Sequence, residues 1–133
     1  MQLGISARNA RLDAIETAVG ASPLLKIMTG SAPADCATAS TGTVLVTMTL
    51  PSDWMSAASA GSKAKLGTWQ DTSADATGTA GYFRIFDSAG SVCHIQGTVT
   101  LTGGGGDMTL DNTSIATGQS VTIATFTLTD GNQ

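Results

Sequence analysis

The side chains best suited to chemistry in this chain are one histidine, two cysteines and ten carboxylates. His94 directly follows Cys93, while Asp71, Asp75 and Asp87 lie earlier in the chain. If the segment around Cys93 is a strand, the two adjacent side chains point to opposite faces and cannot share one metal ion. The aspartate spacing fits neither a calcium loop nor a glycosidase carboxylate pair. We therefore predict no catalytic or metal-binding residue, and we expect His94 to face solvent or a partner.

Other chemical patterns are equally weak. No serine, threonine or cysteine lies in a recognisable nucleophile motif, and the glycine run 103–106 lacks the Lys-Ser/Thr of a phosphate-binding loop. Cys36 and Cys93 allow at most one internal disulfide, and in a reducing cytoplasm we expect two free thiols. The sequence thus predicts a protein that is not an enzyme and that binds no cofactor.

Two tryptophans, Trp54 and Trp69, allow more than one interpretation. Exposed indoles could form a platform for sugar rings, although aromatic residues make up only 5% of the chain. Alternatively, either Trp fills the core or anchors a protein interface, where tryptophan is enriched among the residues that dominate binding. We expect Trp54, with Met55 beside it, to belong to a docking surface.

The first element expected to position such residues is a helix over residues 7–19. Ser6 is a suitable N-cap and Gly20 a suitable stop. Apolar residues recur at helical spacing within it and form one stripe, consisting of Leu12, Ile15 and Val19.

Arg8 and Arg11 occupy the first turns of this helix, where the helix dipole disfavours positive charge. One interpretation is a solvated helix face that tolerates a small cost. The other is that both arginines contact an acidic surface on a partner.

From residue 22 onward the apolar period changes from helical spacing to two, which is typical of strands. The alternation predicts strands over 24–28, 44–50, 63–69, 82–86, 92–101, 107–111, 114–115 and 120–129. The short loop from Asp87 to Gly90 predicts a hairpin with Gly90 in the left-handed region. In the second strand of that hairpin, the side chains expected to face the core are those of Cys93, Ile95, Val99 and Leu101.

The last strand changes phase along its length. Val121 and Ile123 share one parity, whereas Phe126 and Leu128 share the other, which indicates a bulge or a crossing between sheets. The whole pattern predicts a mostly β fold, with a short N-terminal α-helix and a single β-sandwich of the jelly-roll or immunoglobulin-like kind. We expect one domain over residues 1–133, in which 1–20 is the helical segment and 22–133 is the sandwich.

Composition excludes several partners. Charged residues make up 12% of the chain, against about 25% in typical soluble domains. The net charge of -4 argues against a surface that follows nucleic-acid phosphates. No stretch approaches the roughly 20 apolar residues of a membrane-spanning helix, and the first residues lack the features of a signal peptide. We therefore expect no nucleic-acid partner and no membrane partner.

Several stretches resemble small virion proteins of tailed bacteriophages that are encoded among head genes. They are residues 71–90, residues 107–115 continuing to 121–123, and the N-terminal helix followed by residues 26–30. The likeness spans nearly the whole chain and is one of pattern, without chemical motifs. It implies a capsid decoration or cement protein, a small β domain bound outside the shell at junctions between major capsid proteins.

The resemblance also implies partners and a location. The partners would be the major capsid protein and the chain itself, as a homo-dimer or homo-trimer. The location would be the capsid surface of the virion, after synthesis in the host cytoplasm without a signal peptide. The alternatives are a tail component (tube, tip or fibre adaptor) and a receptor- or carbohydrate-binding module.

We expect the protein interface to lie at the N-terminal segment, the helix face and the Trp54 loop. Its candidate residues are Leu3, Ile5, Arg8, Arg11, Trp54 and Met55. Changing Arg8 and Arg11 to Glu should weaken binding to the particle and leave the fold intact.

Overall fold

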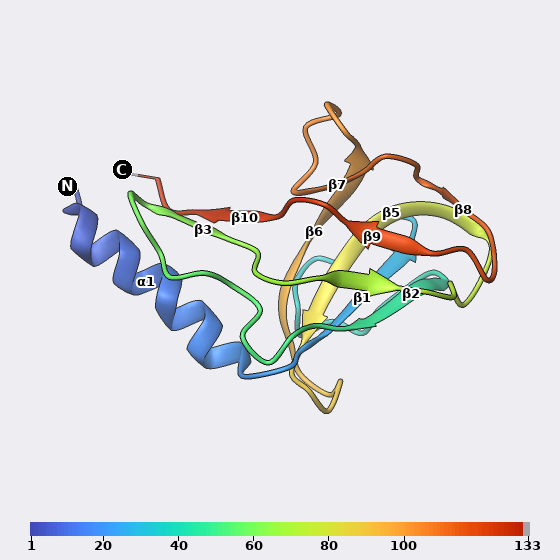
Figure 1. Cartoon of the computed structure of the whole chain (residues 1–133), viewed down its shortest axis with the longest axis horizontal. Coiled ribbons are helices and arrows are strands. Elements are labelled where there is room, and N and C mark those ends of the chain that lie inside the picture. The colour runs from blue at the N-terminus through green and yellow to red at the C-terminus, as the bar shows by residue number, and fades with distance from the viewer. Residues whose placement is uncertain (132–133) are drawn as a thin grey trace.

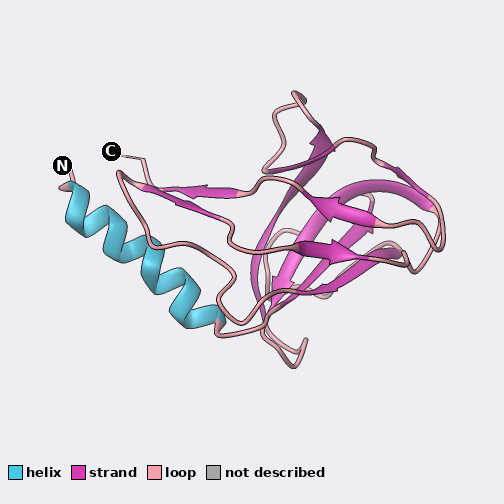
Figure 2. Ribbon diagram, viewed as in Figure 1, coloured by secondary structure: helices cyan, strands magenta, loops and turns pink. Residues whose placement is uncertain are grey.

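A computed structural model of the chain describes residues 1–131 and has a mostly β fold with one helix at its N-terminus (Figure 2). The last two residues of the predicted domain, Asn132 and Gln133, lie outside the described part. The described elements are α1 (Ile5–Val19), β1 (Leu24–Thr29), β2 (Val44–Thr49), β3 (Ser62–Ala64), β4 (Trp69–Asp71), β5 (Gly78–Phe86), β6 (Cys93–Leu101), β7 (Met108–Leu110), β8 (Ser114–Ile115), β9 (Val121–Ile123) and β10 (Thr127–Thr129). The predicted fold class is confirmed, while the jelly-roll or immunoglobulin-like arrangement and the single-domain extent stay predictions.

The main sheet has the strand order β2-β1-β5-β6-β7, with β8 paired to the start of β5. All these pairs are antiparallel except β6 with β7, which are parallel. β5 and β6 form the predicted hairpin, and Gly90 in its turn has φ +72°. Glycine adopts the left-handed backbone conformation without a steric cost because it has no Cβ. The local sequence is therefore sufficient to predict this turn.

Two short antiparallel ribbons, β4–β9 and β3–β10, complete the fold. The chain leaves β9 at Ile123 and enters β10 at Thr127, so it passes from one ribbon to the other where the apolar phase changes. Of the two predicted alternatives, the crossing is therefore confirmed. The prediction of one continuous strand over 120–129 is wrong, because residues 124–126 belong to no strand. The prediction of a single strand over 63–69 is wrong, because Gly67 has φ +73° and separates β3 from β4.

An aromatic row fills the core between the main sheet and the ribbons. The ring centroids of Trp54 and Trp69 lie 6.0 Å apart, and Phe126 lies 5.5 Å from Trp69. Phe83 of β5 meets Phe126 edge to face at 5.5 Å. These four rings join the loop before β3, the ribbons and the main sheet into one apolar cluster.

The prediction of which β6 side chains face the core is correct only for the middle of the strand. Ile95 packs against the core and Val99 is buried. The β5–β6 register shifts between Ile85 and Phe86, and the side chain of Cys93 contacts Cys36 instead of the core. Leu101, the last residue of β6, is 51% exposed. The core positions expected for Cys93 and Leu101 are therefore wrong.

The helix begins and ends close to its predicted bounds. Gly4 is the N-cap in place of Ser6, and no side chain caps the first turn. Gly20 ends the helix as predicted, with its N–H donating to the Glu16 carbonyl at 2.9 Å. Leu12 and Val19 are buried, which confirms the apolar stripe. Figure 1 shows α1 alongside the β3–β10 ribbon at one end of the molecule, with the curled sheet at the other.

Lys63 ties α1 to β3 although it is a charged residue inside the fold. Its ammonium group lies 2.7 Å from the Asp13 carboxylate and 2.6 Å from that of Glu16, both on α1. It also donates to the Ser56 carbonyl at 2.8 Å. A buried charge is tolerated only when it is paired in this way. Among residues 1–131, no helix is long and apolar enough to span a membrane.

Candidate protein-binding cleft

Trp54 and Met55, two of the residues expected at a docking surface, are only 0% and 1% exposed. The Trp54 indole N–H donates to the Gly20 carbonyl at 3.0 Å, and its ring packs against Trp69. Their docking role is therefore wrong for the folded chain, because burying two large apolar side chains in the core is more favourable than leaving them in water. Trp69 is also 0% exposed, so neither tryptophan offers a platform for sugars.

Arg8 and Arg11 meet at the end of β10. The Arg8 Nε–H donates to the Asp130 main-chain carbonyl at 2.7 Å, and Arg11 Nε lies 3.2 Å from the Asp130 carboxylate. The Arg11 side chain is still 61% exposed. Because both arginines fasten the end of β10 to α1, reversing their charges would alter contacts inside the fold. Their role in docking stays a prediction.

The remaining two candidates lie at the N-terminal end of α1. Leu3 is half-buried and Ile5 is exposed. The structure thus places the N-terminal candidates at the Asp130 end of the helix. The Trp54 loop is at its other end, next to Gly20. The six residues do not form one surface.

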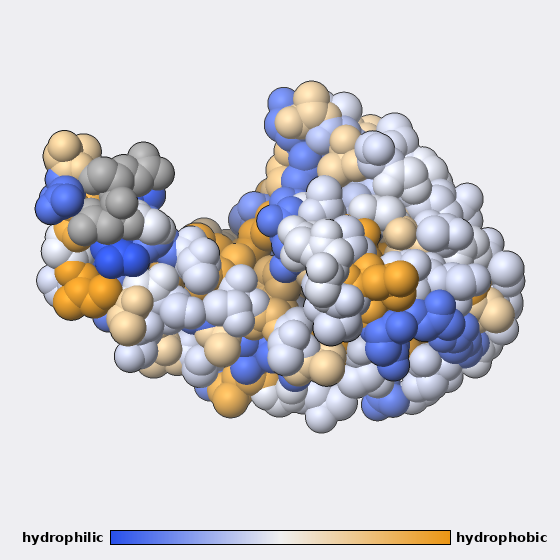
Figure 3. Space-filling view, turned by 90° about the horizontal axis from the view of Figure 1, so that it is seen from above, coloured by the Kyte–Doolittle hydropathy of each residue, from blue (hydrophilic) through white to orange (hydrophobic). Residues whose placement is uncertain are grey.

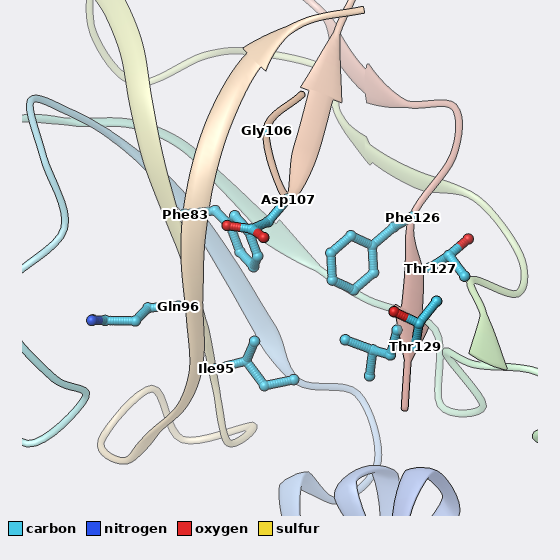
Figure 4. Close-up of a pocket in the computed structure, with 9 residues that line it drawn as sticks. Phe83, Ile95, Gln96, Gly106, Asp107, Phe126, Thr127 and Thr129 are labelled. Carbon is cyan, nitrogen blue, oxygen red and sulfur yellow. The ribbon is translucent and has the colours of Figure 1, made fainter. Parts of the chain in front are cut away.

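A cleft of about 400 Å³ opens between β6 and β10, a site that the sequence did not indicate. It is lined by Phe83, Ile95, Gln96, Gly106, Asp107, Phe126, Thr127, Leu128 and Thr129. Figure 4 shows Phe83, Ile95 and Phe126 pointing into the space between the two strands, while the Gln96 side chain points away from it. Figure 3 shows the surface hollowed between the end that carries α1 and the body of the molecule, with apolar side chains in the hollow.

One wall of the cleft is the free edge of β6. The Thr98 N–H donates to the Asp107 carboxylate at 2.9 Å, so it points away from β5. Main-chain direction alternates along an antiparallel strand, so the Gln96 N–H and carbonyl point the same way. β7 covers only residues 99–101 of this edge. Within the part of the chain that the structure describes, the Gln96 main chain has no strand partner on the cleft side.

The opposite wall is the free edge of β10. The Lys65 N–H donates to the Phe126 carbonyl at 2.8 Å, and the Asp130 N–H donates to the Gly61 carbonyl at 2.9 Å. These bonds belong to the β3 side of the ribbon. By the same alternation, the main-chain groups of Thr127 and Thr129 point away from β3 and toward the cleft.

The β2 edge of the main sheet is covered by another segment of the chain. The Asp75 N–H donates to the Leu45 carbonyl of β2 at 2.8 Å, and the Asp71 carboxylate accepts the Thr47 N–H at 3.1 Å. The segment 71–75, which begins at the last residue of β4, therefore covers β2. Proteins commonly protect a sheet edge from unwanted pairing in this way. At the cleft, by contrast, the described residues supply no strand partner to β6 at Gln96 or to the outer side of β10.

This arrangement suits binding more than reaction chemistry. A strand that entered the cleft could bond to main-chain groups on both sides and place alternate side chains against the cleft lining. Within residues 1–131, no three His, Cys, Asp or Glu side chains group as a metal site. His94 is exposed, as expected. Comparison of the chain with protein-family models, with curated proteins and with solved structures finds no match in any of the three.

Proposed function

We propose that this chain is a structural virion protein of a tailed phage, which binds the outside of the capsid shell and stabilises contacts between major capsid proteins. We further propose that it grips the shell by taking an extended segment of the capsid protein into the cleft between β6 and β10. The resemblance of the sequence to small phage virion proteins supports the proposed location on the capsid. The observation that carries the binding mode is that Gln96 on β6 and Thr127 and Thr129 on β10 turn main-chain groups toward one cleft, and these groups have no strand partner among the described residues.

The chemistry of the occupant follows from the cleft. Strands pair about 4.8 Å apart through main-chain bonds, so an extended peptide is the shape that both edges accept. The occupant would be an extended segment that mixes polar and apolar side chains, because the half-buried Ile95 and Leu128 line the cleft together with Asp107, Thr127 and Thr129. Each main-chain bond contributes about 1 kcal/mol, so a single docked strand binds modestly.

Modest binding is sufficient for a cement protein. Many copies act on one shell, and a copy that bridges two capsid subunits holds them at high effective concentration. A standard protein interface buries about 1,600 Å² in total, so a docked strand would be one part of a larger contact. The exposed N-terminal end of α1, with Ile5 and Arg11, is available for the rest.

The test is co-sedimentation of the purified chain with mature heads that lack it, with the bound copies per head counted. Thr129→Pro removes one outward N–H, and proline is tolerated at such an edge position because that N–H makes no bond to β3. We expect this variant to bind about fivefold more weakly, as expected for the loss of one main-chain bond worth about 1 kcal/mol. The matched control, Thr129→Val, keeps the N–H and should bind like the original chain.

Three outcomes would overturn parts of the proposal. Equal binding by the original chain and both variants would remove the β10 edge from the interface. Failure of the original chain to bind heads, with ring formation in solution, would favour a tail component whose cleft is filled by a second copy. Failure to bind heads, with binding to glycans, would favour a receptor-binding module that uses residues other than the buried tryptophans.

A further inference from the structure

Cys36 and Cys93 are 57 residues apart in sequence, yet their sulfur atoms lie only 2.6 Å apart. Cys36 belongs to the irregular segment between β1 and β2, and Cys93 is the first residue of β6. Both are free thiols, and both residues are half-buried. Their meeting results from the β5–β6 register shift, which turns Cys93 out of the core.

The segment that carries Cys36 is fastened on both sides of it. Arg84 of β5 donates to the Asp35 carbonyl at 2.9 Å and to the Thr38 carbonyl at 2.8 Å. On β6, the Gln96 side-chain amide donates to the Pro33 carbonyl at 2.7 Å. These bonds fix the main chain around Cys36 against the face of the sheet from which Cys93 projects.

Arg84 makes this fastening rigid. Its guanidinium is buried, with the residue only 2% exposed, and it also donates to Gln96 Oε1 at 2.8 Å. The Ser40 hydroxyl accepts a further bond at 3.2 Å. A buried guanidinium with its donors satisfied is costly to release, because moving the segment would leave those donors unpaired. Farther along, the Tyr82 hydroxyl and the Thr41 main chain bond to each other in both directions. The two thiols are therefore held together by contacts that do not involve sulfur.

We propose that Cys36 and Cys93 form an intramolecular disulfide when the protein meets an oxidising medium, and that this bond locks the segment 33–43 onto the start of β6. A reducing cytoplasm keeps both thiols free, so the dithiol and the disulfide are successive states of one site. The inference stands on this geometry and does not depend on the function proposed above.

With glutathione disulfide as the oxidant, the reaction has two exchange steps. The Cys36 thiolate attacks one sulfur of glutathione disulfide, forms a mixed disulfide and releases one glutathione thiolate. The Cys93 thiolate then attacks Cys36 Sγ, forms the internal bond and releases the second glutathione thiolate. Two electrons pass from the protein thiols to the oxidant, and the two protons lost by the cysteines pass to solvent or to the released thiolates.

The surroundings of Cys93 make it the second thiol to react. Burial, followed by the Cys36 contact, raises the pKa of Cys93 to about 12, and nearby Arg84 opposes this only in part. Burial persists in the mixed disulfide and still favours the protonated form of Cys93, which attacks slowly. Closure should therefore become faster as the pH rises.

The test treats the full chain with glutathione disulfide at mildly alkaline pH. It follows the intact mass and then alkylates the denatured protein. We expect a monomer lighter by two hydrogen atoms, no alkylated cysteine, and a Cys36–Cys93 peptide pair in the digest. Adding a dithiol reductant should restore both alkylation sites. Neither single variant can close. Cys93→Ser should stop at one glutathione adduct on Cys36, whereas Cys36→Ser, which keeps only the buried Cys93, should form its adduct more slowly.

A second readout reports the lock itself. Amide hydrogen exchange in residues 33–43 should slow in the oxidised chain relative to the reduced chain, and the double serine variant should not respond to the oxidant. The inference is overturned if the original chain keeps two alkylatable thiols, stops at a glutathione adduct or forms disulfide-linked dimers. These results are read on the original chain, so they hold even if a variant folds poorly.

Discussion

At the scale of single residues, the buried charge of Lys63 connects the helix to the β structure. Burial alone would lower the pKa of Lys63, but hydrogen bonds to Asp13 and Glu16 outweigh it and raise that pKa above 10.5. In return, the Lys63 hydrogen bond, and after it the Ala58 N–H, lower the pKa of Asp13 below 3.8. The contact therefore stabilises the fold in the range where both groups are charged, and it fastens α1 to β3.

The sign of the pH dependence follows from these shifts. Asp13 contributes stability that is present above its unfolded pKa and is lost as the pH falls through its lower folded value, which is below 3.8. The contribution of Lys63 is present below 10.5 and is lost as the pH rises through its higher folded value. We predict that Asp13→Asn reduces stability near pH 7 and makes the decline below pH 3.8 shallower.

The measurement is the urea midpoint of the original chain and of Asp13→Asn, taken across the acid range. The decline should be shallower in the variant but still present, because hydrogen bonds also lower the pKa values of Asp35 and Asp87. Their donors are chiefly Thr38 for Asp35, and the Val92 and Ser91 N–H groups for Asp87. Parallel acid curves for the two proteins would show that the Asp13 contact does not stabilise the fold.

At the scale of elements, the pairing of β1 with β5 depends on a close approach of two glycines. The register of this pair shifts between Met28 and Thr29, and a Cβ on Gly81 would lie 1.9 Å from the Gly30 carbonyl oxygen. We predict that Gly81→Ala lowers the unfolding free energy by about 1–3 kcal/mol, the usual cost of overpacking. Gly131→Ala is the control, since a Cβ there meets nothing within 4 Å. Thermal unfolding compares them, and equal transition temperatures would contradict the close approach.

The elements that the sequence predicted correctly are those with local signals. The hairpin of β5 and β6 has its turn residues between two alternating runs, and the crossing from β9 to β10 appears as a change of phase between Ile123 and Phe126. The errors have long-range causes. Cys93 turns outward because of a register shift across a strand pair, and the position of Trp54 depends on Trp69 and Gly20.

The candidate cleft could not have been predicted from the sequence for the same reason. Whether Gln96 or Thr129 lies on a free edge depends on which strands pair with β6 and β10. Neither residue belongs to a motif, and alternation marks only which face a side chain takes. The sequence did place Arg8 and Arg11 together on one helix. It gave no sign that Asp130, at the far end of the chain, would meet both.

At the scale of the whole molecule, some strand edges are covered by other segments of the chain and others are not. Segment 71–75 covers the β2 edge, and α1 covers the β3–β10 ribbon with the help of Lys63. Between the ribbon and the curled sheet, the β6 and β10 edges face each other across the cleft without a strand partner among the described residues. An open pair of edges is a liability for a free protein. It is an advantage for one whose working state includes a bound strand, and this is the state that we propose on the capsid.

The most direct test of that account is residue-resolved amide hydrogen exchange on the free chain and on the chain bound to phage heads. The outward amides of Gln96, Thr127 and Thr129 should exchange quickly in the free chain and at least about fivefold more slowly on heads, because each would gain a main-chain partner worth about 1 kcal/mol or more. The exposed amide of Ser88, in the β5–β6 turn, should keep its rate. Binding to heads with unchanged exchange at all three cleft amides would contradict strand docking between β6 and β10.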